Sequence, residues 1–194
     1  MSILVGTKYK LMKYLLLAGG LLVMAACQNK APKPSTPEEV IEQASKAPGM
    51  NAGAEKFTLS TPQGWERLDT LMNGAKITFL FAPTLANGFR PNINVVTEDM
   101  RGTDIDAYFK KNISVMSQYM QNFVQGKITE KDVNGVKVKY LDYSHSQNGL
   151  DMDVTMALLP INGIAYVVTV TTQKGERAKY ESQFNEVIGS FKAS

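Results

Sequence analysis

The sequence holds few residues with the chemistry of a catalytic or metal site. His145 is the only histidine, so no histidine pair can bind a metal and no second base is available for a serine triad. Neither Gly-x-Gly-x-x-Gly nor Gly-x-x-x-x-Gly-Lys occurs, so no phosphate-binding loop is indicated. We therefore predict that the protein is not an enzyme and that it uses no cofactor and no resident metal.

One hairpin could still bring His145 close to carboxylates. Pairing the apolar positions of 136–144 and 150–159 on one face requires a three-residue loop, 147–149, which sets His145 opposite Asp151 and Tyr143 opposite Asp153. One interpretation is a weak divalent-metal site or a pH-sensitive contact, because a nearby carboxylate raises a histidine pKa. The other, which we favour, is a solvated pair worth under about 1 kcal/mol.

Cys27 is the only cysteine, and it ends a segment typical of export. Lys13 precedes the apolar stretch 14–23, and the small residues Ala25 and Ala26 come directly before Cys27. Met24-Ala25-Ala26-Cys27 resembles the lipobox of bacterial lipoproteins, in which the cysteine is diacylated and becomes the new N-terminus. We predict a signal peptide over 1–26, with Met12 as a candidate initiator, and a lipid anchor at Cys27. The alternative is an ordinary signal peptide with a chance cysteine at its end.

The signal also carries the excess positive charge. Its three lysines account for the net charge of +3, because eighteen basic and eighteen acidic residues follow it. A near-neutral chain does not indicate a nucleic acid as partner. Residues 27–55 predict a proline-rich linker with a short helix from Thr36 to about Lys46. Gln28 after the cysteine favours sorting to the outer membrane.

Residues 56–194 alternate strand and helix patterns. Strands are predicted over 57–60, 76–82, 93–98, 127–132, 136–144, 150–159 and 165–172. Hairpins are predicted at Asn134-Gly135, Asn148-Gly149 and Asn162-Gly163. Two helices show apolar stripes, one made of Ile105, Phe109, Ile113, Met116, Met120 and Phe123, and one, over 176–191, made of Tyr180, Phe184, Val187, Ile188 and Phe191. The order predicts an α+β fold, an α/β/α sandwich whose mainly antiparallel sheet is covered by two main helices.

Several residues that invite a functional interpretation are better explained by packing. Trp65 follows Gly64 at a strand end, where the glycine lets the ring fold onto the core, and we favour this over ligand stacking. Four methionines lie on predicted core faces, where an adaptable side chain fills space: Met116, Met120, Met152 and Met156.

Short motifs of the chain carry a family resemblance. The opening Pro62-Gln63-Gly64-Trp65, the long middle helix, the hairpin meander and the closing Ile188-Gly189-Ser190-Phe191 together resemble the PsbP-like superfamily over about residues 57–192. That group includes photosynthetic PsbP proteins, DcrB-type bacterial lipoproteins and a Ran-binding eukaryotic relative. The DcrB-type lipoproteins are the nearer match. The resemblance implies an α/β/α sandwich and says little about activity, since its members share a scaffold and not a reaction.

The loop 83–91 is the candidate recognition site. It holds two large apolar residues, Leu85 and Phe89, with Arg90 beside them, in a segment that is otherwise rich in turn formers. An equally weighted alternative is that the loop folds back and buries Phe89. We expect a membrane-anchored, non-enzymatic binding or accessory module of the bacterial cell envelope, whose partner is an unknown envelope protein. The alternative is a periplasmic small-ligand or metal-binding protein with a pocket between sheet and helix.

Overall fold

A computed structural model describes residues 56–72, 75–86 and 88–194. The predicted signal peptide, the linker with its helix and the anchor residue Cys27 lie outside these residues. The described strands are β1 (Phe57–Thr58), β2 (Glu66–Met72), β3 (Ala75–Phe81), β4 (Asn92–Asp99), β5 (Gln121–Val133), β6 (Val136–Gln147), β7 (Leu150–Ile161), β8 (Ile164–Gln173) and β9 (Lys192–Ala193). The helices are α3 (Ile105–Tyr119) and α4 (Glu181–Ser190), with a 3₁₀ turn at Arg177–Tyr180 before α4.

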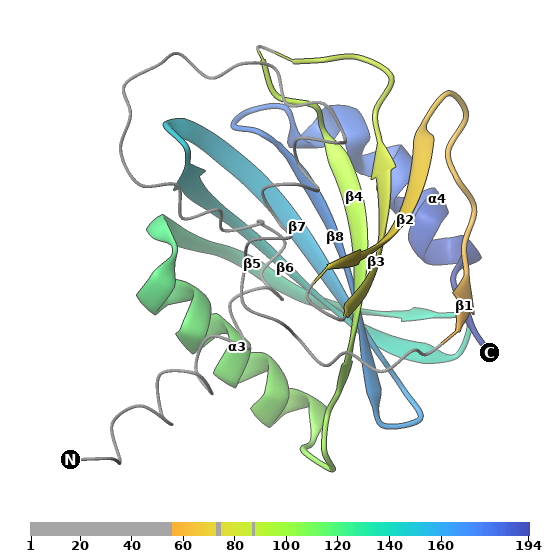
Figure 1. Ribbon diagram of the computed structural model, residues 1–194. Helices are drawn as coiled ribbons and strands as arrows, with labels where there is room; N and C mark the ends of the chain where they lie inside the picture. The colour runs from red at the N-terminus through yellow and green to blue at the C-terminus, as the bar shows by residue number, and fades with distance from the viewer. Residues whose placement is uncertain (1–55, 73–74, 87) are drawn as a thin grey trace.

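Seven strands form one antiparallel sheet in the order β2-β3-β4-β8-β7-β6-β5. Helix α3 carries the chain from β4 to the far edge, and the meander β5 to β8 then returns until β8 pairs with β4 (Figure 1). Strands β2 and β5 are therefore the two edges of the sheet.

Three two-residue turns fix the meander. Asn134, Asn148 and Asn162 have φ between 51° and 54°, and the glycine after each has φ between 78° and 80°. Positive φ at both central positions is the geometry of a type I′ turn, which matches the twist of antiparallel strands and favours Asn-Gly. The three predicted hairpins are confirmed.

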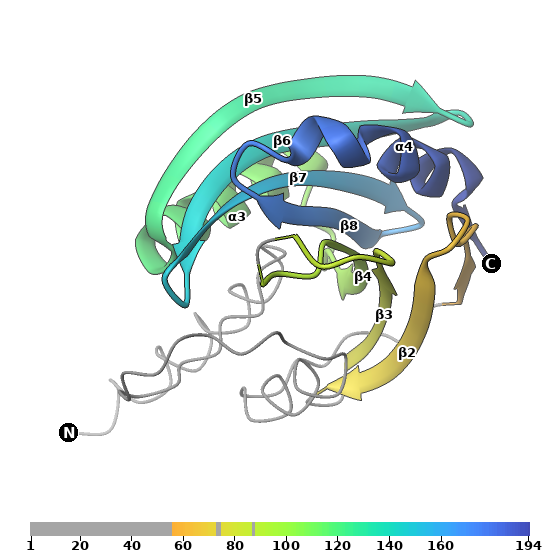
Figure 2. The same ribbon diagram turned by 90° about the horizontal axis from the view of Figure 1, so that it is seen from above.

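The sheet is strongly curved, and its two helices lie on opposite faces (Figure 2). Because side chains alternate along a strand, each strand feeds two separate cores. The α3-side core consists of Met100, Tyr108, Phe109, Met116, Met120, Leu141, Tyr143, Met152, Val154, Met156, Leu158, Ala165 and Val167. The α4-side core consists of Leu80, Ile93, Val95, Val138, Tyr140, Ala157, Leu159, Tyr166, Val168, Val170, Phe184, Val187, Ile188 and Phe191. The predicted fold class is confirmed, as is the core placement of the four methionines.

Helix α3 begins where the sequence predicts and ends earlier. The Asp104 side chain accepts hydrogen bonds from the backbone N–H groups of Asp106 and Ala107, at 3.0 and 2.9 Å, which caps the first turn. The backbone turns extended at Met120, and Asn122 has φ 53°. The prediction that Phe123 continues the helical stripe is therefore wrong. Phe123 lies in β5, although its ring still packs against Tyr143 with centroids 5.6 Å apart.

Two parts of the sheet were not predicted. Strand β2 pairs along its whole length with β3, and β5 begins at Gln121 instead of residue 127. Both are edge strands, which bury little and so carry weak apolar alternation. Trp65 precedes β2 and packs on the α4-side core, with its ring edge-on to Tyr180 at 6.0 Å, so the predicted packing role is confirmed.

Candidate binding surface

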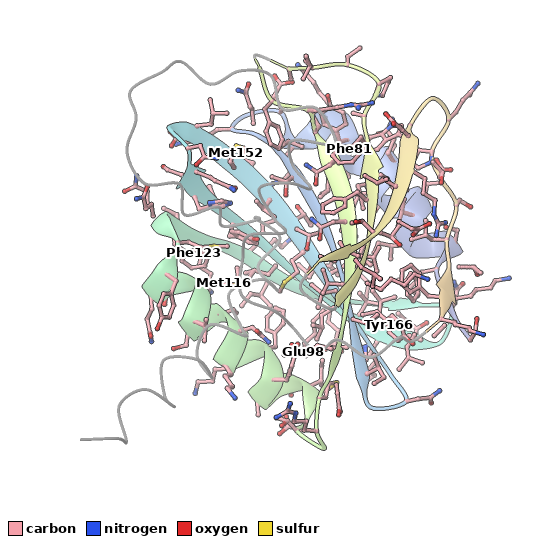
Figure 3. The ribbon with its side chains drawn as sticks, viewed as in Figure 1. Phe81, Glu98, Met116, Phe123, Met152 and Tyr166 are labelled. Atoms are coloured by element: carbon pink, nitrogen blue, oxygen red, sulfur yellow. The ribbon has the colours of Figure 1, made fainter. Side chains whose placement is uncertain are left out.

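Four buried side chains on the α3 side of β3 and β4 belong to neither core: Ile77, Phe79, Phe81 and Val96. Their side follows from the register, since Ile77 pairs with Val96 and Val96 pairs with Val167 of the α3-side core. Helix α3 lies beside β5, at a distance from β2 and β3 (Figure 1). We call the surface formed by these four residues and Asn94 the β3–β4 face; Phe81 is labelled in Figure 3.

The middle of this surface is polar. Asn94 stands between Phe79 of β3 and Thr169 of β8 in one row of cross-strand pairs. Thr169 is 0% exposed, and its hydroxyl has no hydrogen-bond partner among the described residues. A buried polar atom without a partner costs about 1–3 kcal/mol, so its presence calls for an explanation.

One end of the β3–β4 face is closed by Arg90. The Phe79 and Phe81 rings stack with centroids 5.5 Å apart, and the Arg90 guanidinium lies 5.3 Å from the centre of the Phe81 ring. Arg90 Nε donates to the carbonyl of Ala82 at 2.7 Å, and Nη2 donates to Glu66 at 2.9 Å. The guanidinium is thus held by three contacts within the domain.

The three residues of the predicted recognition loop, Leu85, Phe89 and Arg90, lie in different environments. Phe89 is half-buried and packs against the α3-side core, as in the alternative in which the loop folds back. Arg90 is committed to Glu66, Ala82 and Phe81, whereas Leu85 remains 50% exposed. Of the three predicted residues, Leu85 alone is an exposed apolar side chain.

A stripe of α3 borders the β3–β4 face. Tyr108, Asn112 and Val115 are spaced four and three residues apart, so they lie on one side of the helix. The Tyr108 hydroxyl donates to the carboxylate of Glu98 on β4, which places this stripe toward β4. Asn112 is 4% exposed and donates to the Tyr108 carbonyl at 3.0 Å, while its Oδ1 atom has no partner among the described residues.

Glu98 is an unusual carboxyl, and Figure 3 shows it labelled near α3. Burial raises its pKa from the ordinary 4.5 to about 7, against the opposing effects of the Tyr108 hydrogen bond and the positive charges of Lys111 and Arg101. The neighbouring Asp99 adds to the rise. No sequence pattern identifies this group, because the cause is the burial that α3 produces.

The predicted cluster of His145 with two aspartates is wrong. The turn contains two residues, Asn148 and Gly149, so Gln147 pairs with Leu150 and His145 pairs with Met152. His145 is 4% exposed, lies 5.9 Å from the Tyr143 ring, and has its pKa lowered by burial. The register shift occurs because β6 buries side chains on both faces, Val138 and Tyr140 toward α4 and Leu141 and Tyr143 toward α3.

The two aspartates lie on the opposite face and have other partners. Asp151 accepts from the Ser146 hydroxyl at 2.6 Å, and Asp153 accepts from the Gly175 N–H at 2.9 Å. Arg177 lies 3.7 Å from Asp153 and 3.6 Å from Asp142, and it donates to the Tyr143 carbonyl at 2.9 Å. This network ties the 3₁₀ turn to the sheet.

The described residues show neither a metal-binding cluster nor a membrane-spanning helix. Within residues 56–72, 75–86 and 88–194, three or more His, Cys, Asp or Glu side chains do not come together in a way that could hold a metal ion. The described helices include none with the length and apolar character that crossing a membrane requires.

A comparison with protein families gives one match. The family model described as serine/threonine kinase C-terminal domain matches residues 50–193, which include all the described strands and helices. A search of curated proteins gave no match.

Three solved structures share the fold at low sequence identity. A protein of unknown function, PA94 from Pseudomonas aeruginosa, is 14% identical with a TM-score of 0.54, covering 71% of this chain and 96% of that one. LpqN of Mycobacterium tuberculosis, described as involved in cell envelope biogenesis, is 14% identical with a TM-score of 0.53, covering 84% and 99%. Cyanobacterial PsbP from Synechocystis sp. PCC 6803 is 16% identical with a TM-score of 0.50, covering 75% and 95%. The expected PsbP-like fold is thereby confirmed.

Proposed function

Because this chain belongs to the serine/threonine kinase C-terminal domain family, we propose that it is a non-enzymatic binding module, held at the bacterial cell envelope by a lipid on Cys27. The family name places the domain at the C-terminal end of kinases, and the glycine-rich Gly-x-Gly-x-x-Gly motif does not occur in this sequence. A domain that accompanies kinases and shares its fold with PsbP and LpqN suits a binding or accessory role.

The β3–β4 face is the observation that carries the binding role. Phe79, Phe81 and Ile77 are large, buried apolar side chains outside both cores, and Phe79 lies in one row of cross-strand pairs with Asn94 and Thr169. Apolar area with a few fixed polar groups is the usual composition of a binding site.

The anchor is supported by the order of charged, apolar and small residues before Cys27. The DcrB-type lipoproteins of the PsbP-like group offer the same arrangement of an anchored domain. Gln28 after the cysteine favours the outer membrane. The full chain would thus present its domain to envelope proteins at the end of the linker 27–55.

The test of the anchor is fractionation of the full chain in a bacterial host. Cys27→Ala is expected to move the protein from the membrane to the soluble fraction and to abolish labelling with radioactive palmitate. Ser35→Ala, in the same linker, is the matched control and should remain in the membrane. A Cys27→Ala protein that is still in the membrane fraction would contradict the anchor.

A second candidate is a periplasmic protein that binds a small ligand between helix and sheet. Two buried polar atoms that lack a partner among the described residues favour it, Oδ1 of Asn112 on α3 and the hydroxyl of Thr169 on β8. A specific ligand stabilises the native state by mass action. Thermal unfolding against metabolites and divalent metals would therefore show a concentration-dependent rise for this candidate, and none for a module that binds only proteins.

A further inference from the structure

The side chains of the β3–β4 face are buried, although the described helices lie elsewhere. Ile77, Phe79 and Phe81 are 4%, 3% and 2% exposed. Helix α4 lies on the opposite side of the sheet, and α3 lies beside β5 (Figures 1 and 2). The Arg90 guanidinium covers only the Phe81 end of the face. A further part of the chain must therefore lie over it.

The edge strand β2 shows on which side of the sheet this cover lies. Leu68 pairs with Phe79, so it is on the same side as the β3–β4 face, and it is half-buried although it belongs to neither core. Leu71 is on the other side of the same strand and is 73% exposed. Apart from residues 73–74 and 87, the chain beyond the described residues is the N-terminal segment 1–55.

We propose that the predicted linker helix, Thr36 to about Lys46, packs on the β3–β4 face and closes it in the mature protein. Its apolar residues follow the i, i+3, i+4, i+7 spacing of a single helical stripe: Pro37, Val40, Ile41 and Ala44. An isolated helix of this length is marginal in water and needs such a stripe to be buried against another element. The proposal goes beyond the binding function above, since it concerns what covers the face before any partner reaches it.

The other parts of the N-terminal segment match the face less well. The apolar stretch 14–23 is removed with the predicted signal peptide. Residues 28–35 contain no large apolar side chain, and residues 47–55 contain one, Met50, between two glycines. These two stretches have the composition of connectors on either side of the helix.

The connection to the domain is long enough for this arrangement. Residues 47–55 can span up to about 30 Å when extended. A domain of roughly 140 residues has a radius of gyration of about 14 Å. The helix can therefore reach the β3–β4 face from Lys56, where the chain enters β1.

The experiment measures the reactivity of a single cysteine in the mature chain 27–194 carrying Cys27→Ala, which contains no other thiol. Val96→Cys places the thiol on the β3–β4 face, and Val95→Cys places it in the α4-side core as the matched control. The probe is the disulfide reagent 5,5′-dithiobis(2-nitrobenzoic acid). Val40→Asp with Ile41→Asp should raise the labelling rate at Val96→Cys at least tenfold and leave the rate at Val95→Cys unchanged.

Two further linker variants separate the apolar stripe from the rest of the helix. Val40→Ala with Ile41→Ala should raise the rate at Val96→Cys by a smaller factor, and Glu38→Gln with Glu42→Gln, on the polar side, should not change it. Circular dichroism and the melting temperature check that each variant is folded.

Three results would overturn the proposal. One is an equal labelling rate at Val96→Cys with the wild-type and the Val40→Asp, Ile41→Asp linkers. Another is an equal rise at Val95→Cys, which would report general loosening of the domain. The third is protection of Val96→Cys in the full chain 1–194 carrying Cys27→Ala that is lost in 27–194, because the signal peptide would then be the cover. Each of these results leaves the membrane anchor at Cys27 standing, since that is decided by fractionation.

Discussion

Strands β4 and β8 bury both apolar and polar side chains on each of their two faces. Toward α4 they place Ile93, Val95, Val168 and Val170 of the α4-side core, together with Thr97 and Thr172. On the other side they place Val96 and Val167, together with Asn94, Thr169 and Thr171. The two faces differ in how one hydroxyl group on each is satisfied: the Thr172 hydroxyl hydrogen-bonds backbone carbonyls of Asp153 and Gln173, whereas the Thr169 hydroxyl has no partner among the described residues.

The largest effects are expected at two neighbours on β3. Leu80 is fully buried in the α4-side core, and Leu80→Ala should cost about 2–5 kcal/mol of unfolding free energy, because it leaves a cavity. Phe79, on the β3–β4 face, is 3% exposed, and Phe79→Ala should cost about 3–5 kcal/mol through the cavity and the lost stacking on Phe81. Urea unfolding of both variants measures the two costs. A cost below about 1.5 kcal/mol for Phe79→Ala would show that the β3–β4 face contributes less to stability than the α4-side core.

A pH profile separates the two sides next. The unfolded chain releases the Glu98 proton near pH 4.5, whereas the folded protein retains it until about pH 7, because its pKa is raised. The contribution of Glu98 to the free energy of unfolding is therefore complete below pH 4.5 and is lost as the pH rises to about 7. Glu98→Gln keeps an acceptor for Tyr108 and carries no charge. It should be more stable than wild type at pH 8 by on the order of 2 kcal/mol, and equal to it at pH 4. Glu181→Gln, an exposed position on α4, is the control and should show no such crossover.

Exchanging valine and threonine between the two faces of β8 should change the unfolding free energy in opposite directions, and by smaller amounts. Val168→Thr inserts a hydroxyl into the α4-side core and should cost about 1–2 kcal/mol. Thr169→Val removes a hydroxyl that has no partner among the described residues, and should be neutral or stabilise by up to about 1 kcal/mol. Thermal unfolding of the pair is sufficient. Destabilisation by both changes to the same extent would mean that Thr169 is as well accommodated as Val168.

The smallest effect concerns two arginines on adjacent elements. Arg90→Lys loses the geometry that joins Ala82, Glu66 and the Phe81 ring, and should cost about 0.5–1 kcal/mol. Arg67→Lys, whose partner is the exposed Asp69 on the same strand, should cost less than about 0.5 kcal/mol. Differential scanning calorimetry of both variants tests whether the Arg90 contacts stabilise the end of the β3–β4 face.

Local signals were sufficient to predict the strand and helix order of most of the domain. Each Asn-Gly pair occupies a type I′ turn, and the stripe of α4 packs as expected with Phe184, Val187 and Ile188 buried. These features depend on residues close together in the sequence. The edge strand β2 was missed because Glu66–Met72 buries too little to show an alternating pattern.

The register of the β6–β7 hairpin illustrates the limit of pattern analysis. Treating Val138 and Tyr140 as representative of the whole strand assigns β6 a single buried face, and a three-residue loop follows from that assumption. The strand instead turns its buried side chains from α4 to α3 partway along, and His145 enters the α3-side core. Only tertiary packing determines where such a change occurs. The same reason explains why neither Glu98 nor the β3–β4 face was predicted, since each depends on where α3 comes to lie.

The two-stranded sheet β1–β9 has a mechanical consequence. Phe57 pairs with Ala193, and the Ser194 N–H donates to the Lys56 carbonyl at 2.9 Å, so the entry and exit of the domain lie side by side. Tension applied through residue 56 would act first on these two short strands and on the Phe57–Phe191 ring stack, peeling one pair after another. The seven-stranded sheet would bear load only after β1 had detached. A force applied at residue 56 would therefore separate β1 from β9 while the seven-stranded sheet stays folded.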